Sequence, residues 1–246
     1  MPKIDNIAKF FKPNPFAGDT GALAPDLAAA FAEPLENRTE AVVNHLGRVL
    51  LAAFAHPKPV IDDSGKVQEQ SSASDPFADD NSLFRGEFLG GKKAVEIFSD
   101  LHALQKVYPQ GRPVPMSSRD IARTALTRGD GLLILNPQSE NMQYLGRSAV
   151  AALATQTPWT APSKDSQILS EIFAGIELIN PVYSDCVSEM QITPAEHGRY
   201  WLELVIPEDA AGQAQDLVRA IVVTIQETPY LRARLDTLEI RPRLAA

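Results

Sequence analysis

Residues 86–92 (GEFLGGK) have the spacing of a phosphate-binding loop up to the lysine at its end. In such a loop the lysine is followed by Ser or Thr, which holds magnesium, and then by a helix whose first N–H groups face the phosphates. Here Lys93 occupies the hydroxyl position, and residues 94–98 have the pattern of a strand. The segment is therefore interpreted as a β-hairpin that turns at Gly90-Gly91, and no nucleotide site is predicted.

Ser99, Asp100 and His102 have the residue types of a hydrolase triad. A triad nucleophile stands on a strained turn beside an oxyanion pocket, and its partners reach it through tertiary folding. The sequence contains no Gly-x-Ser-x-Gly motif. Capping explains these polar residues better, so Ser99 is predicted to cap a helix over residues 100–107. No catalytic residue is assigned.

Metal ligation is not predicted either. The four histidines are far apart and lack the paired spacing of a metal site: His45, His56, His102 and His197. The single cysteine, Cys186, has no histidine near it in the sequence and is interpreted as a buried structural thiol. The acidic pairs at 62–63 and 79–80 lack the alternating ligands of a calcium loop. We therefore expect neither a metal nor a cofactor.

One position remains as a candidate for binding. Asn136-Pro137 follows the unbroken apolar run 132–135, and in open sheets ligands tend to lie beyond the carboxyl ends of buried strands. Asn136, together with Arg112, is therefore predicted to line a ligand pocket there. The alternative is a turn in which the side chain of Asn136 bonds its own backbone.

The stretch from residue 112 to residue 137 must position these two side chains. Prolines at 113 and 115 hold its beginning extended. Ser117 or Ser118 is predicted to cap a helix that runs to residue 128, and Gly129 is predicted to end it in the left-handed conformation. Residues 132–135 are predicted to form a strand that is covered on both faces.

The rest of the chain is assigned from its periodicity. The further expected helices are 37–46, 147–154, 166–173 and 211–227. The further expected strands are 49–54, 83–89, 94–98, 176–179, 187–192, 200–206 and 238–240. Residues 49–54 are also compatible with a continued helix, because alanine at 52, 53 and 55 favours one. The order in the second half predicts a sheet with one helix on one face.

Composition sets bounds on the function. The chain has 246 residues, of which 44% are hydrophobic and 22% charged, which is typical of a soluble globular protein. The net charge is −8, and residues 62–80 contribute −5 of it with six acids and one lysine. No strongly basic face is present, so nucleic acid is not an expected partner. Without a long apolar run or a signal-peptide core, and with one cysteine, a cytoplasmic protein is expected.

Three units are predicted: a segment and linker at 1–36, a domain at 37–158 and a second domain at 163–246. Residues 1–12 place apolar side chains at helical spacing between lysines. They are interpreted as a terminal helix docked on its own domain or frayed, with peripheral contact to a membrane or a partner as the alternative. Residues 56–82 are interpreted as a mobile acidic loop.

Several segments together resemble a known family. They are RPVP at 112–115, LLILNP at 132–137, Gly146-Arg147 with the apolar residues 149–153, Trp159, and LRARLDTL at 231–238. These segments resemble the SseB family (enhanced serine sensitivity), and most closely its actinobacterial members, over residues 38–246. Asn136 stands where the family commonly has Asp. The resemblance implies a fold and a layout but no site residues, because the family's name records a phenotype.

The element order and the resemblance together predict an α+β fold. Its N-terminal domain has a mixed sheet with helices, and its smaller C-terminal domain has a sheet and a helix. The first functional hypothesis is a non-catalytic cytoplasmic protein that binds another protein, since no nucleophile, base or metal set is found. The alternative is a sensor of, or an enzyme acting on, a small amino-acid-like ligand, with its pocket beyond strand 132–135.

Overall fold

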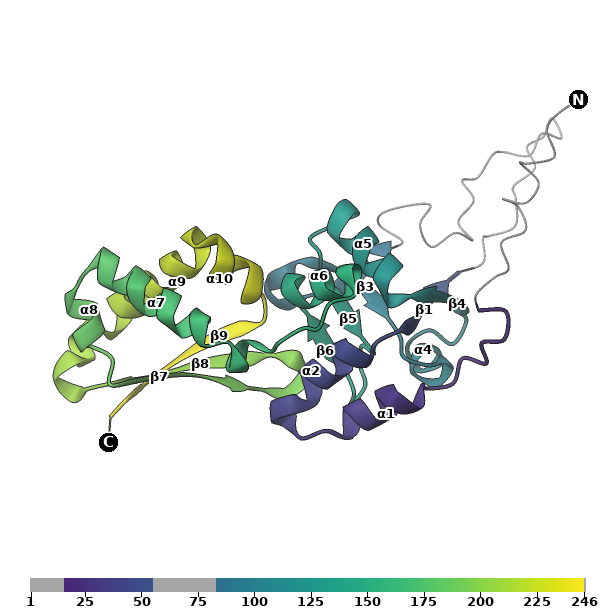
Figure 1. Ribbon diagram of the computed structural model, residues 1–246, viewed down its shortest axis with the longest axis horizontal. Coiled ribbons are helices and arrows are strands. Elements are labelled where there is room, and N and C mark those ends of the chain that lie inside the picture. Colours follow the sequence, from purple (N-terminus) through teal and green to yellow (C-terminus); the bar gives the residue numbers. More distant parts are fainter. Residues whose placement is uncertain (1–15, 55–82, 246) are drawn as a thin grey trace, which may run out of the picture.

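The computed structural model describes residues 16–54 and 83–245. The predicted amphipathic segment 1–12 and the acidic loop 56–82 lie outside these described residues. Figure 1 shows an elongated molecule, with the C-terminal strands and helices at one end and the remaining elements at the other. None of the described helices is long and apolar enough to cross a membrane.

Two small sheets form the N-terminal part. The larger sheet has the strand order β2 (Gly86–Glu87), β3 (Lys93–Ile97), β5 (Leu133–Leu135) and β6 (Gln143–Leu145). Strands β3 and β5 are parallel, and the other two pairs are antiparallel. The smaller sheet pairs β1 (Arg48–Ala53) antiparallel with β4 (Arg112–Ser117). A bridge between Leu50 and Phe98 joins the two sheets.

The hairpin and the buried strand predicted for this sheet are confirmed, but the strand predicted over residues 83–89 is only Gly86–Glu87. Strands β2 and β3 form the expected hairpin, which turns through the short 3₁₀ helix η2 (Leu89–Gly91). Strand β5 is buried on both faces, as its unbroken apolar sequence predicts. Leu133 and Leu135 belong to the main core, and Ile134 packs on the opposite side with Phe88.

Four helices share the main core with the inner face of this sheet. They are α1 (Pro25–Ala32), α2 (Leu35–His45), α5 (Ser118–Arg128) and α6 (Arg147–Thr155). Helix α5 begins as predicted, because the side chain of Ser117 accepts a hydrogen bond from the backbone N–H of Asp120 at 3.1 Å. A fifth helix, α4 (Leu101–Val107), packs against β1.

Two predicted helix ends are wrong. Asp100, not Ser99, caps α4, and its carboxylate accepts from the N–H of Ala103 at 2.9 Å. Ser99 is buried before the cap and bonds other groups. Gly129 has φ −145°, and the left-handed residue is Gly131 with φ 71°. A side chain at Gly129 would meet the ring of Phe84 at 2.3 Å, so this glycine is required for space and not for its conformation.

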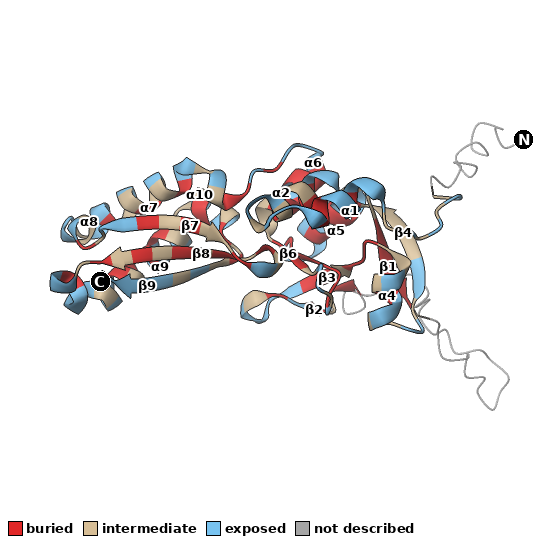
Figure 2. Cartoon of the chain, turned by 90° about the horizontal axis from the view of Figure 1, so that it is seen from below, coloured by how far each residue is buried: buried red, intermediate tan, exposed pale blue. Residues whose placement is uncertain are grey.

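The C-terminal part contains one sheet with helices on one face. Its elements are 3₁₀ helix η3 (Pro162–Lys164), α7 (Ser166–Ile179), α8 (Val182–Asp185), β7 (Glu189–Pro194), 3₁₀ helix η4 (Glu196–Gly198), β8 (Tyr200–Ile206), 3₁₀ helix η5 (Glu208–Gln213), α9 (Ala214–Glu227), α10 (Pro229–Arg234) and β9 (Leu238–Leu244). Strand β8 is central, antiparallel to β7 and parallel to β9. Buried and partly exposed residues alternate along β8, as Figure 2 shows.

The sequence reading of α7 was wrong at its end. Residues 176–179, predicted as a strand, form the last turn of α7. Ile168, Ile172 and Ile176 recur every four residues and are all buried, so one helical stripe continues through this segment. Gly175 allows close packing against Thr224 of α9, because an added Cβ would lie 2.1 Å from that side chain. Consequently α7 and α9 together cover the sheet, where one helix was predicted.

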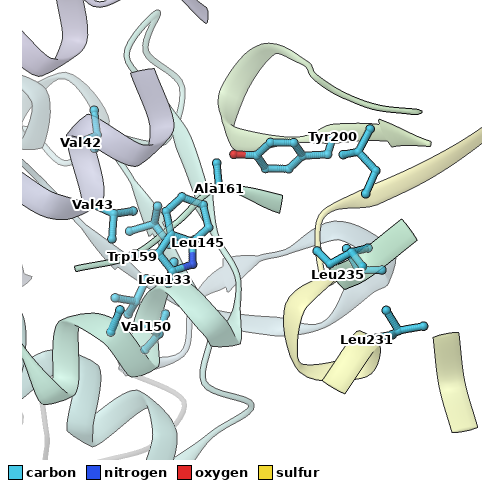
Figure 3. Close-up of a cluster of buried hydrophobic side chains, with 14 of the residues drawn as sticks. Val42, Val43, Leu133, Leu145, Val150, Trp159, Ala161, Tyr200, Leu231 and Leu235 are labelled. Carbon is cyan, nitrogen blue, oxygen red and sulfur yellow. The ribbon is translucent and has the colours of Figure 1, made fainter. Parts of the chain in front are cut away.

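One hydrophobic core extends through both parts of the chain. Figure 3 shows Trp159, from the segment between α6 and α7, close to Val43, Leu133 and Leu145 of the N-terminal part. Tyr200 and other C-terminal residues belong to the same cluster. The α+β fold class is confirmed, whereas the division into domains at 37–158 and 163–246 remains a prediction.

Candidate functional site

Asn136 joins the ends of two neighbouring strands. Its side chain is 2% exposed. Its Oδ1 accepts from the backbone N–H of Ser99 at 2.8 Å, and its Nδ2 donates to Ser99 Oγ at 2.8 Å. Its own N–H donates to the carbonyl of Ile97 at 2.9 Å. The side chain therefore bonds a residue 37 positions away and not its own turn.

Arg112 lies elsewhere. It is exposed at the first position of β4, while the last position, Ser117, pairs with Arg48 of β1. Arg48 Nη1 donates to the carbonyl of Ser99 at 2.7 Å, and Ser99 in turn bonds Asn136. The end of the β1–β4 pair that contains Ser117 is therefore the end close to Asn136. Five residues of strand, about 16 Å, separate Arg112 from that end. The structure does not bring Arg112 and Asn136 together, and a role for either in binding a ligand stays a prediction.

A polar hollow of about 470 Å³ does lie just beyond the end of β5. Its cationic side chains are Arg38 of α2 and Lys106 of α4. Its carboxylates are Glu140, from the loop between β5 and β6, and Glu196 of η4. The hollow therefore offers both signs of charge, and residues from both parts of the chain line it.

Gln143 forms the buried part of this hollow. Its side chain is 3% exposed, and its Oε1 accepts from Thr39 Oγ1 at 3.0 Å. Its Nε2 donor makes no hydrogen bond with any described residue. Gly198, with φ 74°, leaves space beside it, because a Cβ there would lie 3.1 Å from Gln143 Oε1 and 2.8 Å from the carbonyl of Tyr144. A fixed amide donor is thus available to a ligand.

Backbone strain is concentrated around the same hollow. Of the four described non-glycine residues with positive φ, three lie in its lining or within two residues of it: Asn136 (50°), Gln138 (60°) and His197 (63°). Gln138 and His197 line the hollow, and Asn136 lies two residues before Gln138. Such conformations cost about 1–3 kcal/mol each, and they cluster at functional sites. The strain supports the assignment of this hollow as the candidate site.

Among the described residues that line the hollow, no nucleophile is hydrogen-bonded to a base. Ser139 Oγ donates to the carbonyl of Asn136 at 2.9 Å, so its proton is held by a backbone acceptor and not by a base. His197 Nδ1 lies 3.1 Å from the carbonyl of Met142. Within residues 16–54 and 83–245, no group of three or more His, Cys, Asp or Glu side chains could hold a metal ion.

Comparison with known proteins identifies the family. The family model of the SseB protein N-terminal domain matches residues 25–152, which is slightly more than half of the chain. The chain belongs to the SseB family. Neither the curated proteins nor the solved structures contain a match to it.

The residues that line the hollow lie partly inside and partly outside the range matched by the SseB family model. Arg38, Lys106 and Gln143 lie within the matched residues 25–152, whereas Glu196 and His197 follow them. No sequence pattern points to this set, because its members are polar residues of common types on separate elements. The only local signal was the His-Gly pair at 197–198 before a strand, which is typical of a turn.

We predict that Asn136→Ala destabilises this SseB-family chain by about 1–3 kcal/mol, because the buried N–H of Ser99 loses its acceptor and Ser99 Oγ loses one of its two partners. The free energy of unfolding from urea denaturation, followed by circular dichroism, measures this effect. Asn141→Ala is the matched control, since Asn141 is exposed in the same loop. Equal stabilities of the two variants would show that the link from Asn136 to Ser99 is energetically unimportant.

Proposed function

We propose that this SseB-family protein binds a small molecule that carries both a carboxylate and an ammonium group, as amino acids do. The observation that carries the proposal is the polar hollow beyond β5, lined by two cationic and two anionic side chains. Pockets that hold small ligands occur preferentially between structural units, and a few convergent polar groups orient the ligand. This is the alternative that the sequence analysis placed beyond strand 132–135.

The groups of the hollow fit the two ends of such a ligand. Lys106 makes no ion pair within the described part of the chain, and the Nε2 of Gln143 is also available. Together they would receive the carboxylate. Glu140 and Glu196 would receive the ammonium group, because neither carboxylate is bonded to another described side chain. Charge-assisted hydrogen bonds of this kind are roughly twice as strong as neutral ones.

We propose that the ligand is bound in this hollow and is not chemically converted there. The hydroxyl of Ser139 is held by a carbonyl, and the ring of His197 lies against another carbonyl. A covalent reaction needs a nucleophile within hydrogen-bond reach of its base. The described residues of the hollow provide no such pair, which supports a sensor or carrier over an enzyme.

A thermal-shift screen of the L-amino acids tests the proposal. A ligand that binds only the folded chain raises the melting temperature by mass action. At least one amino acid is expected to do so, and its N-acetyl and carboxamide derivatives, which each lack one charge, are expected to do so less. In Lys106→Gln and in Glu140→Gln the dissociation constant should rise about ten-fold.

Lys93→Gln is the matched control, because Lys93 is exposed on β3 and does not line the hollow. It should leave the dissociation constant unchanged. If no amino acid shifts the melting temperature, or if the control variant weakens binding as much as Lys106→Gln does, this assignment of the hollow is wrong.

A protein-binding role is the second proposal. The contact elements suggested by the sequence, residues 1–12 and 56–82, lie outside the described residues. The described part offers a different one at the junction of α7 and α8, where Leu178 is 88% exposed and Ile179 and Val182 are also exposed. Contiguous exposed apolar residues of this kind often mark interaction sites. This proposal takes precedence if the ligand screen fails.

Two further assignments are proposals from the sequence. We place the protein in the cytoplasm, which is supported by a single cysteine, Cys186, that is buried and unpaired. We also propose that the sequence is most similar to the actinobacterial members of the SseB family. The motifs at residues 112–115, 132–137 and 231–238 support this.

A further inference from the structure

A second hollow, of about 620 Å³, lies where the beginning of α5 meets the ends of α2 and α6. It shares no lining residue with the polar hollow beyond β5. Ser118 and Arg119 of α5 lie on one side of it. Side chains of α2 and α6 provide much of the rest. A hollow of this size can hold a small organic molecule.

Ser118 places an unused hydroxyl in this hollow. Its backbone N–H donates to the carbonyl of Gly47 at 2.9 Å. Its side chain is 6% exposed, and its Oγ makes no hydrogen bond with any residue that the structure describes. The hydroxyl is therefore available to a ligand group in the hollow that Ser118 lines.

Arg119 adds an unused cation beside it. The guanidinium makes no ion pair or hydrogen bond with the described residues, and its Nε is completely buried without a partner. By contrast, the guanidinium groups of Arg48, Arg147 and Arg234 each pair with a carboxylate. Arg119 is also in the first turn of α5, where the helix dipole is positive and favours an anion.

The rest of the lining is mixed, with polar side chains at Asn44, His45, Gln156 and Thr157 and apolar side chains between them. Leu46, at the end of α2, and Leu153 of α6 are buried core residues that line it. The lining also includes the carboxylate of Asp26, and Asp120 lies close to the same helix start. These two carboxylates disfavour a doubly charged anion more than a singly charged one, because electrostatic repulsion grows with the charge of the ligand.

We propose that this hollow binds a monocarboxylate with an apolar body. The carboxylate accepts hydrogen bonds from Arg119 and from Ser118 Oγ at the positive end of α5, and the hydrocarbon lies against Leu46 and Leu153. Removal of that hydrocarbon from water adds affinity in proportion to the apolar area buried. The carboxylate satisfies the two groups that have no partner in the described chain.

Titration calorimetry of the full chain with hexanoate tests the proposal. Hexanoate should bind, acetate should bind at least ten-fold more weakly because it lacks the apolar body, and hexan-1-ol and inorganic phosphate should give no measurable heat of binding. Arg119→Gln and Ser118→Ala should each raise the dissociation constant for hexanoate, by about ten-fold and several-fold respectively.

Arg243→Gln is the matched control, since Arg243 is exposed on β9 and lines neither hollow. It should bind hexanoate as the natural chain does. The proposal is overturned if no probe binds, if acetate binds as well as hexanoate, or if Arg119→Gln retains full affinity. Amino acids that bind in the hollow beyond β5 should do so equally in Arg119→Gln, which separates the two sites.

Discussion

Trp159→Ala is expected to lower the free energy of unfolding by about 3–5 kcal/mol, the usual cost of removing a buried tryptophan. The side chain is 6% exposed and lies close to Val43, Leu133 and Leu145, as Figure 3 shows. Its Nε1 donates to Ser148 Oγ at 3.1 Å, a partner that the variant would strand. A cavity would thus open where α2, β5 and β6 meet.

Trp201→Ala provides the matched control, since Trp201 is the only other tryptophan of the chain. It lies on the outer face of β8, partly exposed, with Arg241 stacked on its ring at 3.6 Å. Its loss should cost clearly less than that of Trp159. Because each variant removes a fluorophore, urea unfolding should be followed by circular dichroism. A smaller loss at Trp159 than at Trp201 would mean that the core tolerates the cavity.

Asp236→Ala is expected to lower the free energy of unfolding by about 2–3 kcal/mol, because the backbone N–H and the guanidinium of Arg147 lose the carboxylate that bonds them. The carboxylate of Asp236 is 1% exposed. It accepts from the backbone N–H of Arg147 at 2.8 Å and from its Nη2 at 2.6 Å, and Lys92 Nζ lies 3.7 Å away. The hydrogen bond to Asp236 raises the pKa of Arg147 above its ordinary value.

Asp216→Ala is the control for Asp236, since Asp216 forms an exposed ion pair with Arg219 on α9. Exposed pairs contribute at most about 1 kcal/mol. The double variant Asp236→Ala with Arg147→Met should recover part of the lost stability, because both charges are then absent. A double variant less stable than Asp236→Ala alone would show that Arg147 stabilises the fold by other contacts.

Both predictions concern contacts that hold the two parts of the chain together. Asp236, in the C-terminal part, occupies the start of α6 in the N-terminal part, where the free N–H groups favour a negative charge. Trp159 is fixed by reciprocal bonds with Asn44, whose Oδ1 and Nδ2 bond the backbone of Trp159 at 2.8 and 3.1 Å. Since Glu196 and His197 reach the polar hollow from the C-terminal part, loosening these contacts should also weaken a ligand held there.

The predictions from sequence succeeded where the cause was local. The apolar run of β5, the alternation of β8 and the cap of α5 at Ser117 each depend on neighbours within a few residues. They failed where contacts with a distant element determined the local secondary structure. The last turn of α7 reads as a strand in isolation, but it remains helical because its stripe packs against α9.

The candidate site shows the same limit. A hollow does lie beyond β5, where the sequence predicted a ligand pocket, but neither Arg112 nor Asn136 lines it. Its buried amide depends on a hydrogen bond between Thr39 and Gln143, which are 104 residues apart. No periodicity or motif encodes such a pair.

By itself the sequence determined the strand and helix at the centre of the N-terminal part, the acidity of residues 62–80 and the resemblance to the SseB family. These follow from side-chain type and spacing along the chain. Only the tertiary structure decided which polar groups have no partner and share a hollow. Hydrogen-bond satisfaction is a property of spatial neighbours: Asn136 found its partner in Ser99, whereas Gln143, Ser118 and Arg119 retain unused donors within the described structure.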